Sequence, residues 1–96
     1  MTFEIEFSED SERQLAELTS RDRRTLLDSI ETLLTHEPTT PTKHRKLLRP
    51  NPVAAWELRV GDFRVFYNIF GTEVHILGVI HKPLTYAWLE QHSIPE

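Results

Sequence analysis

Apolar and polar residues alternate at the start of the chain, where Phe3, Ile5 and Phe7 are separated by two glutamates. A period of two is typical of a strand with one buried face and one exposed face. This segment therefore predicts the first strand of a sheet.

Two amphipathic helices are expected next. Ser8 is a suitable N-cap for the first helix, whose first turn is acidic and which is expected to end near Thr19. Ser20 can cap the second helix, in which polar residues such as Arg24 turn outward. The inner stripe of the second helix recurs at steps of three and four residues and contains Leu26, Leu27, Ile30, Leu33 and Leu34. Together the two helices predict an antiparallel hairpin.

The second half of the chain predicts three strands and a last helix. Pro38 and Pro41 interrupt regular structure, so residues 37–42 are expected to form a loop. A helix is expected to open at Pro83. Turn residues and alternating apolar positions predict strands over residues 56–60, 63–69 and 74–80, the last of them apolar at nearly every position, as a central strand would be.

This element order, β-α-α-β-β-β-α, defines the fold class. We expect an α+β fold in which the helical hairpin packs on a mostly antiparallel four-stranded sheet. A chain of 96 residues has room for one hydrophobic core, so residues 1–96 are expected to form a single domain.

The composition limits the kinds of site the chain can carry and the cellular compartments in which it is expected. The chain has no cysteine, which excludes a disulfide framework, a thiolate zinc site and a cysteine nucleophile. Its first residues are acidic where a secretory signal carries basic residues, and no apolar run approaches the ~18 residues of a membrane span. These features predict a cytoplasmic protein without a membrane partner.

The charge is distributed unevenly, although the formal net charge is −4. Residues 1–42 carry a net charge of −6 and residues 43–96 carry +2. Between positions 43 and 64, six basic residues stand against two acids, so a local positive field is compatible with an acidic protein. The six basic residues are Lys43, Arg45, Lys46, Arg49, Arg59 and Arg64.

Arg64 is the leading candidate for chemistry because it lies in the middle of a predicted strand, on the face opposite its apolar neighbours. A charge at such a position needs a partner. One interpretation is an ion pair with a helix acid, such as Glu17 or Asp28. The other is a rigid guanidinium that faces a phosphate and forms two parallel hydrogen bonds with it.

Three further residues have both a structural and a functional interpretation. Arg59 either pairs with Glu57 or flanks Arg64 across the hairpin. His81 is either an idle surface histidine or a proton carrier near neutral pH. Tyr86 either packs beside Trp88 or stacks on a base. The histidines share no metal-ligand spacing and the glycines are solitary, so neither a metal site nor a phosphate loop is predicted.

Three segments resemble the core of the RelE family of toxins in their order and spacing. They are Lys46-Leu47-Leu48, the hairpin from Trp56 to Ile69 with its Leu-Arg-x-Gly-x-Phe-Arg-x-x-Tyr pattern, and Val79-Ile80-His81-Lys82. The resemblance covers nearly the whole chain and marks the RelE/ParE superfamily more strongly than any single branch.

The resemblance implies a fold and an activity. It implies the toxin of a toxin–antitoxin pair that enters the ribosome and cleaves messenger RNA without metal or other cofactor, by attack of a 2′-hydroxyl on the adjacent phosphate. Arg64 then matches the arginine that stabilises the phosphorane charge, Lys82 or His81 matches the group acting on the leaving oxygen, and Tyr86 matches the terminal tyrosine. The expected partners are a cognate antitoxin, the ribosome and messenger RNA, whose phosphates would contact Lys43, Arg45, Lys46, Arg49 and Arg59.

One departure from the family keeps two interpretations open. Glu57 stands where RelE carries a lysine, so it is either the proton acceptor or the mark of a branch with changed activity. The alternative functions are a toxin of the ParE branch, which binds DNA gyrase without cleaving RNA, and a decayed toxin that only binds its antitoxin.

Overall fold

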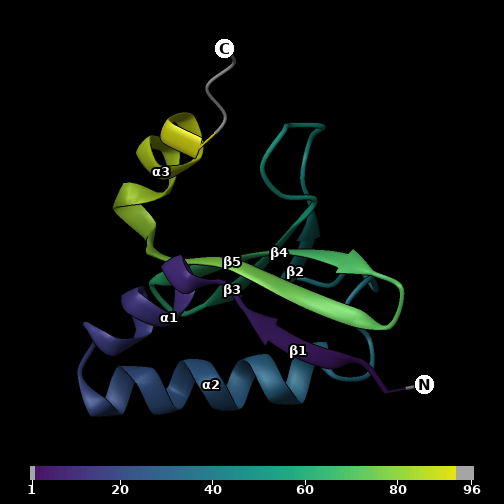
Figure 1. Cartoon of the computed structure of the whole chain (residues 1–96), viewed down its shortest axis with the longest axis horizontal. Coiled ribbons are helices and arrows are strands. Elements are labelled where there is room, and N and C mark those ends of the chain that lie inside the picture. Colours follow the sequence, from purple (N-terminus) through teal and green to yellow (C-terminus); the bar gives the residue numbers. More distant parts are fainter. Residues whose placement is uncertain (1, 93–96) are drawn as a thin grey trace.

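A computed structural model describes residues 2–92 as one sheet with helices against both faces (Figure 1). The elements are β1 (Glu4–Phe7), α1 (Glu9–Ala16), α2 (Ser20–Leu34), β2 (Arg45–Leu47), β3 (Trp56–Val60), β4 (Phe63–Phe70), β5 (Glu73–His81), a 3-10 turn η1 (Lys82–Leu84) and α3 (Thr85–His92). No helix within this described part of the chain has both the length and the apolar character of a membrane span.

The sheet has five strands in the order β1-β5-β4-β3-β2. β1 pairs in parallel with β5, and every other neighbouring pair is antiparallel. The α+β class and the central position of β5 are therefore confirmed, whereas the prediction of four strands was wrong by one. β2 has only three residues, too few for a visible alternation, and pairing with β3 defines it.

The start of α1 confirms Ser8 as its N-cap, because the Ser8 hydroxyl accepts a hydrogen bond from the Ser11 backbone at 3.1 Å. The helix ends at Ala16, earlier than expected. Arg23 donates to the carbonyl oxygens of Leu15, Ala16 and Leu18, and a guanidinium on these last carbonyls stabilises the end of the helix.

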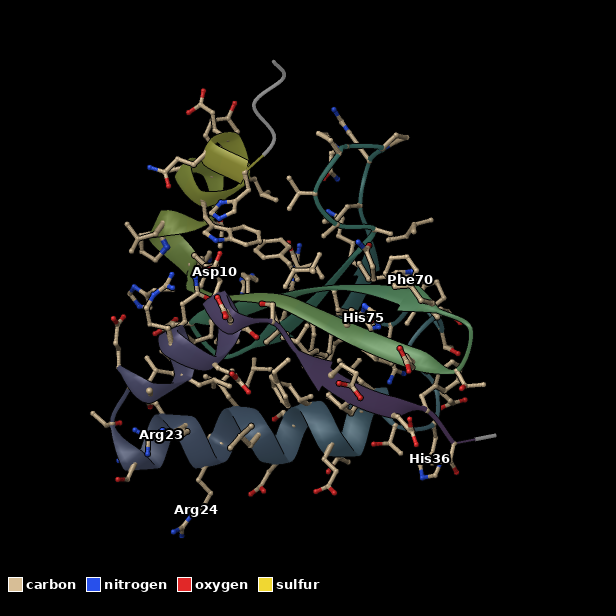
Figure 2. The ribbon with its side chains drawn as sticks, viewed as in Figure 1. Asp10, Arg23, Arg24, His36, Phe70 and His75 are labelled. Atoms are coloured by element: carbon tan, nitrogen blue, oxygen red, sulfur yellow. The ribbon has the colours of Figure 1, made fainter. Side chains whose placement is uncertain are left out.

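The predicted cap of α2 was wrong by one residue. The hydroxyl of Thr19, rather than that of Ser20, accepts a hydrogen bond from the Asp22 backbone N–H at 3.1 Å. Arg24 projects from α2 away from the sheet, as expected (Figure 2). Leu27 was placed on the inner stripe but is exposed; the buried residues of the helix are Leu26, Ile30 and Leu34.

The hydrophobic core is divided between the two faces of the sheet. The larger cluster lies between the sheet and the helical hairpin and contains Leu15, Leu26, Ile30, Leu34, Trp56, Leu58, Val65, Tyr67, Val74, Ile76 and Val79. The smaller cluster lies on the opposite face and contains Ala54, Phe66, Ile80 and Trp88. The chain thus leaves most of the second face to polar and charged residues.

α3 reaches the second face through Trp88, whose ring stacks on Phe66 with centroids 5.2 Å apart. Gly78 makes room for this ring, since an added Cβ would overlap the indole. The helix begins at Thr85 rather than at Pro83, which lies in η1.

Candidate functional site

The strands β2, β3 and β4 place four charged side chains on one face of the sheet, opposite the helical hairpin. Arg59 is the register partner of Arg64, and Lys46 is the register partner of Glu57. Because register partners in antiparallel strands project to the same side, Lys46, Glu57, Arg59 and Arg64 share this surface, which we call the charged face.

Glu57 lies at the centre of the charged face. Its Oε2 accepts a hydrogen bond from Arg59 Nε at 2.7 Å and lies 3.8 Å from Arg64 Nε. The side chain of Glu57 is 13% exposed and that of Arg59 is 43% exposed. The predicted ion pair between Arg59 and Glu57 is therefore confirmed, and a second, longer one joins Glu57 to Arg64.

Arg64 is held from several sides, with only 13% of its side chain exposed. Its Nη1 donates to the carbonyl oxygens of Gly61 at 3.0 Å and Phe63 at 2.9 Å. The proposed helix partners, Glu17 and Asp28, were wrong, because Arg64 faces away from the hairpin. The result is a positive charge fixed beside a carboxylate at the rim of the sheet.

A groove lies beside the charged face, between the segment before β3 and α3. Its volume is about 540 Å³, and one wall is formed by residues 46–51 and the other by Tyr86 and Leu89. Lys46 and Arg49 are its charged residues, and none of the lining residues is acidic. The Tyr86 side chain is among the most exposed apolar groups of residues 2–92, at 82%. We call this feature the cationic groove; it brings together three of the predicted site residues.

Arg45 does not belong to this surface, which corrects its proposed role in RNA binding. It is 7% exposed and projects toward the helical hairpin. Its guanidinium donates to the carbonyl oxygens of Leu33 at 2.7 Å and Thr40 at 2.9 Å. These bonds hold the loop after α2, so Arg45 has a structural function.

His81 also lies apart from Arg64, so the two do not form a catalytic pair. The register pairs Phe63 with His81 and Arg64 with Ile80, which places His81 on the opposite side of the sheet from Arg64. The His81 and Phe63 rings contact each other with centroids 5.4 Å apart. A one-residue difference along a strand reverses the face, and the local sequence pattern does not predict this register.

Lys82 and Lys43 are both exposed. The backbone N–H of Lys82 donates to the Asp62 carbonyl at 2.7 Å, which joins the end of β5 to the turn that also holds Arg64. Lys43 lies in the loop before β2 and is not among the residues that line the cationic groove.

Burial raises the pKa of the Tyr67 phenol well above its ordinary value, and the nearby Arg45 charge lowers it by a smaller amount. The Tyr67 hydroxyl donates to the Pro38 carbonyl at 2.6 Å. Tyr67 belongs to the larger core rather than to the charged face.

One group of possible metal ligands occurs within residues 2–92: Glu4, Glu6 and Glu73, whose carboxylate oxygens lie within 4.8 Å of one another. They lie on β1 and at the start of β5, at the edge of the sheet far from β2 and β3. Glu73 also contacts His75 at 2.8 Å. The group is separate from the charged face.

Two residues important for the groove were missed by the sequence reading. Asn51 and Asn68 bond to the segment between β2 and β3 with their side-chain amides. The proline on each side of Asn51 was the available signal, because such a run predicts an irregular segment whose backbone groups need side-chain partners.

Comparison with known proteins identifies the class to which this fold and surface belong. Residues 5–83 match the family of the ParE toxin of type II toxin–antitoxin systems, parDE. The chain therefore belongs to this family, within the RelE/ParE superfamily that the sequence motifs indicated. None of the curated proteins matches the chain in sequence.

Solved structures of toxins and toxin–antitoxin complexes have the same fold. The RelBE2 toxin–antitoxin complex of Mycobacterium tuberculosis is 26% identical, with a TM-score of 0.73 over 84% of this chain and 92% of that one. The archaeal RelE–RelB complex of Pyrococcus horikoshii is 22% identical, with a TM-score of 0.69 over 85% and 97%. A mutant of the Escherichia coli toxin RelE in the free state is 18% identical, with a TM-score of 0.70 over 97% and 95%. The last two comparisons concern the fold alone.

Proposed function

We propose that this toxin inhibits translation as a metal-independent endoribonuclease that cleaves messenger RNA on the ribosome, in the cytoplasm. The observation that carries the proposal is the Arg64 guanidinium, fixed beside the Glu57 carboxylate on a sheet face that adjoins the cationic groove. A preorganised positive charge stabilises a transition state better than a mobile one, because it needs no reorganisation during the reaction.

The proposed reaction uses three side chains. The Glu57 carboxylate takes the proton of the ribose 2′-hydroxyl, whose oxygen then attacks the adjacent phosphorus. Arg64 stabilises the added negative charge on the phosphorane. The bond from phosphorus to the 5′-oxygen breaks, and the Lys82 ammonium protonates that oxygen; the products are a 2′,3′-cyclic phosphate and a 5′-hydroxyl end. Lys82 is preferred over His81 because His81 lies on the other face.

A cognate antitoxin is the proposed regulatory partner. The similar structures from Mycobacterium tuberculosis and Pyrococcus horikoshii are complexes of a toxin with its antitoxin. A segment of the antitoxin laid over the charged face would neutralise its cations and exclude RNA.

The test is an in vitro translation reaction in which cleavage sites in the message are mapped. Arg64→Ala should reduce cleavage about a hundredfold or more, because removal of one preorganised charge-stabilising group commonly has an effect of this size. Arg24→Ala, on the outer side of α2, is the matched control and should cleave normally. The proposal fails if the wild-type protein cuts no message, or if Arg64→Ala cuts equally well.

A second candidate is a toxin that binds DNA gyrase without cleaving RNA. It is favoured by the low exposure of Arg64, whose Nη1 is already bonded to two carbonyl oxygens. The matching ParE family points the same way, since its resemblance implies a gyrase target. Inhibition of supercoiling with intact message would select this function. Inactivity in both assays would indicate a decayed toxin that only binds its antitoxin.

A further inference from the structure

The segment between β2 and β3 is held by one side chain at its centre. Asn51 Nδ2 donates to the carbonyl oxygens of Arg49 and Ala54, each at 2.8 Å. Asn51 Oδ1 accepts from the backbone N–H groups of Val53 at 2.9 Å and Ala54 at 3.0 Å. Both N–H donors and the carbonyl oxygen of this amide are therefore used within six consecutive residues, 49–54.

A second amide attaches the same segment to the sheet. Asn68 on β4 accepts from the Ala55 N–H at 2.6 Å through Oδ1 and donates to the Val53 carbonyl at 3.2 Å through Nδ2. The Leu48 N–H donates to the Ala55 carbonyl at 2.8 Å and closes the base of the loop. These bonds fix the backbone of the loop at its centre and at its base, and Pro50 and Pro52 restrict it further.

This loop forms one wall of the cationic groove and carries Arg49. The loop and α3 rise from the same face of the sheet, while α1 and α2 cover the other (Figure 1). Leu48 and Leu89, from opposite walls, both pack against the smaller core cluster. The groove therefore has an apolar floor, a cationic wall and an exposed aromatic ring on the far side.

We propose that Asn51 and Asn68 are positioning residues that preform the cationic groove as a subsite for one unstacked base of the RNA substrate. The base would lie between the loop and the Tyr86 ring, and its flanking phosphates would contact Lys46 and Arg49. The identity of the ligand rests on the proposed function, whereas the rigidity of the loop does not.

The positive charge of the groove and its connection to the charged face through Lys46 favour a nucleotide as its ligand. The lining contains two cations and no acid, on a protein whose net charge is −4. Lys46 lines the groove and is also the register partner of Glu57, which contacts both Arg59 and Arg64. A phosphate backbone that follows these cations across the charged face passes directly beside the groove.

Amide hydrogen exchange tests the rigidity of the loop without any activity. In Asn51→Ala, the amides of Val53 and Ala54 lose their acceptor and should exchange about tenfold faster or more. In Asn68→Ala, the Ala55 amide should show the same change. Sheet amides such as that of Val65 should be unaffected, and so should all loop amides in Thr39→Ala, an exposed control in another loop. Unchanged exchange in both asparagine variants would overturn the positioning role.

Cleavage kinetics on ribosome-bound message test the ligand. Asn51→Ala should raise KM about tenfold and leave kcat within about twofold, because a loosened wall must be ordered again on each binding event. Asn51→Asp keeps both acceptor bonds but sets a carboxylate oxygen against the carbonyl oxygens of Arg49 and Ala54, so it should raise KM as well. Preference for the base beside the cleaved phosphate should also relax in Asn51→Ala.

Each other outcome contradicts a definite part of the proposal. A fall in kcat with unchanged KM assigns the asparagines to stability of the catalytic face and overturns the subsite. Faster exchange with unchanged KM leaves a rigid loop but no base subsite. If Asn51→Ala weakens binding of an acidic antitoxin peptide and not of an RNA oligonucleotide, the groove is a protein-docking site. If the wild-type protein cuts no RNA, the proposed function fails together with the base subsite, and the exchange result alone decides the positioning role.

Discussion

The two faces of the sheet differ in what their side chains do. The face under α1 and α2 is packed with aliphatic and aromatic residues, and its polar groups, such as the Tyr67 hydroxyl, are bonded within the protein. The opposite face has a core of only four buried residues, and the charged side chains of β2, β3 and β4 lie beside it. Stability therefore depends mainly on one face, which leaves the side chains of the other free to vary with function.

The largest expected effect is on the hairpin face. Ile30→Ala should lower the free energy of unfolding by about 2–5 kcal/mol, because Ile30 is fully buried between α2 and the sheet and its truncation leaves a cavity. Chemical denaturation measures the change. Leu27→Ala on the same helix is the matched control and should cost much less, since Leu27 is exposed. Equal losses for the two variants would contradict the assignment of the main core to this face.

The next prediction concerns the small core of the charged face. Gly78→Ala should destabilise the protein by about 1–3 kcal/mol, because the new methyl group overlaps the Trp88 ring and forces α3 to shift. Tryptophan fluorescence and thermal unfolding would detect the shift. Thr72→Ala, in the exposed turn before the same strand, should leave both unchanged. A native spectrum and stability for Gly78→Ala would mean that α3 is not seated on Gly78.

Much of this two-sided arrangement could be predicted from the sequence. Alternation placed β3 and β4 correctly and put Arg64 opposite Val65 and Tyr67, because side-chain direction in a strand depends only on local spacing. Phe66 lies two residues after Arg64 and therefore on the same face of the sheet. It is nevertheless buried, because Trp88 of α3 stacks on its ring. Local patterns do not contain information about such covering elements.

The parts of the site that were missed depend on register between strands. Arg64 pairs with Glu57 on the neighbouring strand rather than with a helix acid, and His81 falls on the opposite face because it is paired with Phe63. Asn51 and Asn68 meet on the same loop only after β3 and β4 have paired. β2 is defined by pairing alone. A single sequence specifies these registers through packing, which its local pattern does not show.

A pH-dependent effect should distinguish the faces further. Burial raises the folded-state pKa of Tyr67 above the unfolded value of about 10. The contribution of Tyr67 to the free energy of unfolding is therefore fully present below about pH 10 and is lost as the pH rises toward the folded-state pKa. The free energy of unfolding should then fall by up to about 1.4 kcal/mol per pH unit from this residue.

Denaturation of the wild type and Tyr67→Phe across this alkaline range isolates the contribution. The variant should be about 1 kcal/mol less stable at neutral pH, because the bond to Pro38 is lost, and its stability should fall less steeply with pH. Tyr86→Phe, at an exposed position, is the control and should retain the wild-type slope. Parallel curves for wild type and Tyr67→Phe would show that Tyr67 does not cause the alkaline loss.

The smallest effect on stability is expected on the charged face, at Arg59. Its ion pair with Glu57 is partly exposed and screened by solvent, so Arg59→Ala should change the free energy of unfolding by about 1 kcal/mol or less. Binding of single-stranded RNA should respond differently. If Arg59 contacts a phosphate, the slope of the logarithm of affinity against the logarithm of salt concentration should become shallower by about one in Arg59→Ala. Arg24→Ala should change neither quantity. A large loss of stability with an unchanged salt dependence would place Arg59 among the structural residues and remove the functional distinction between the two faces.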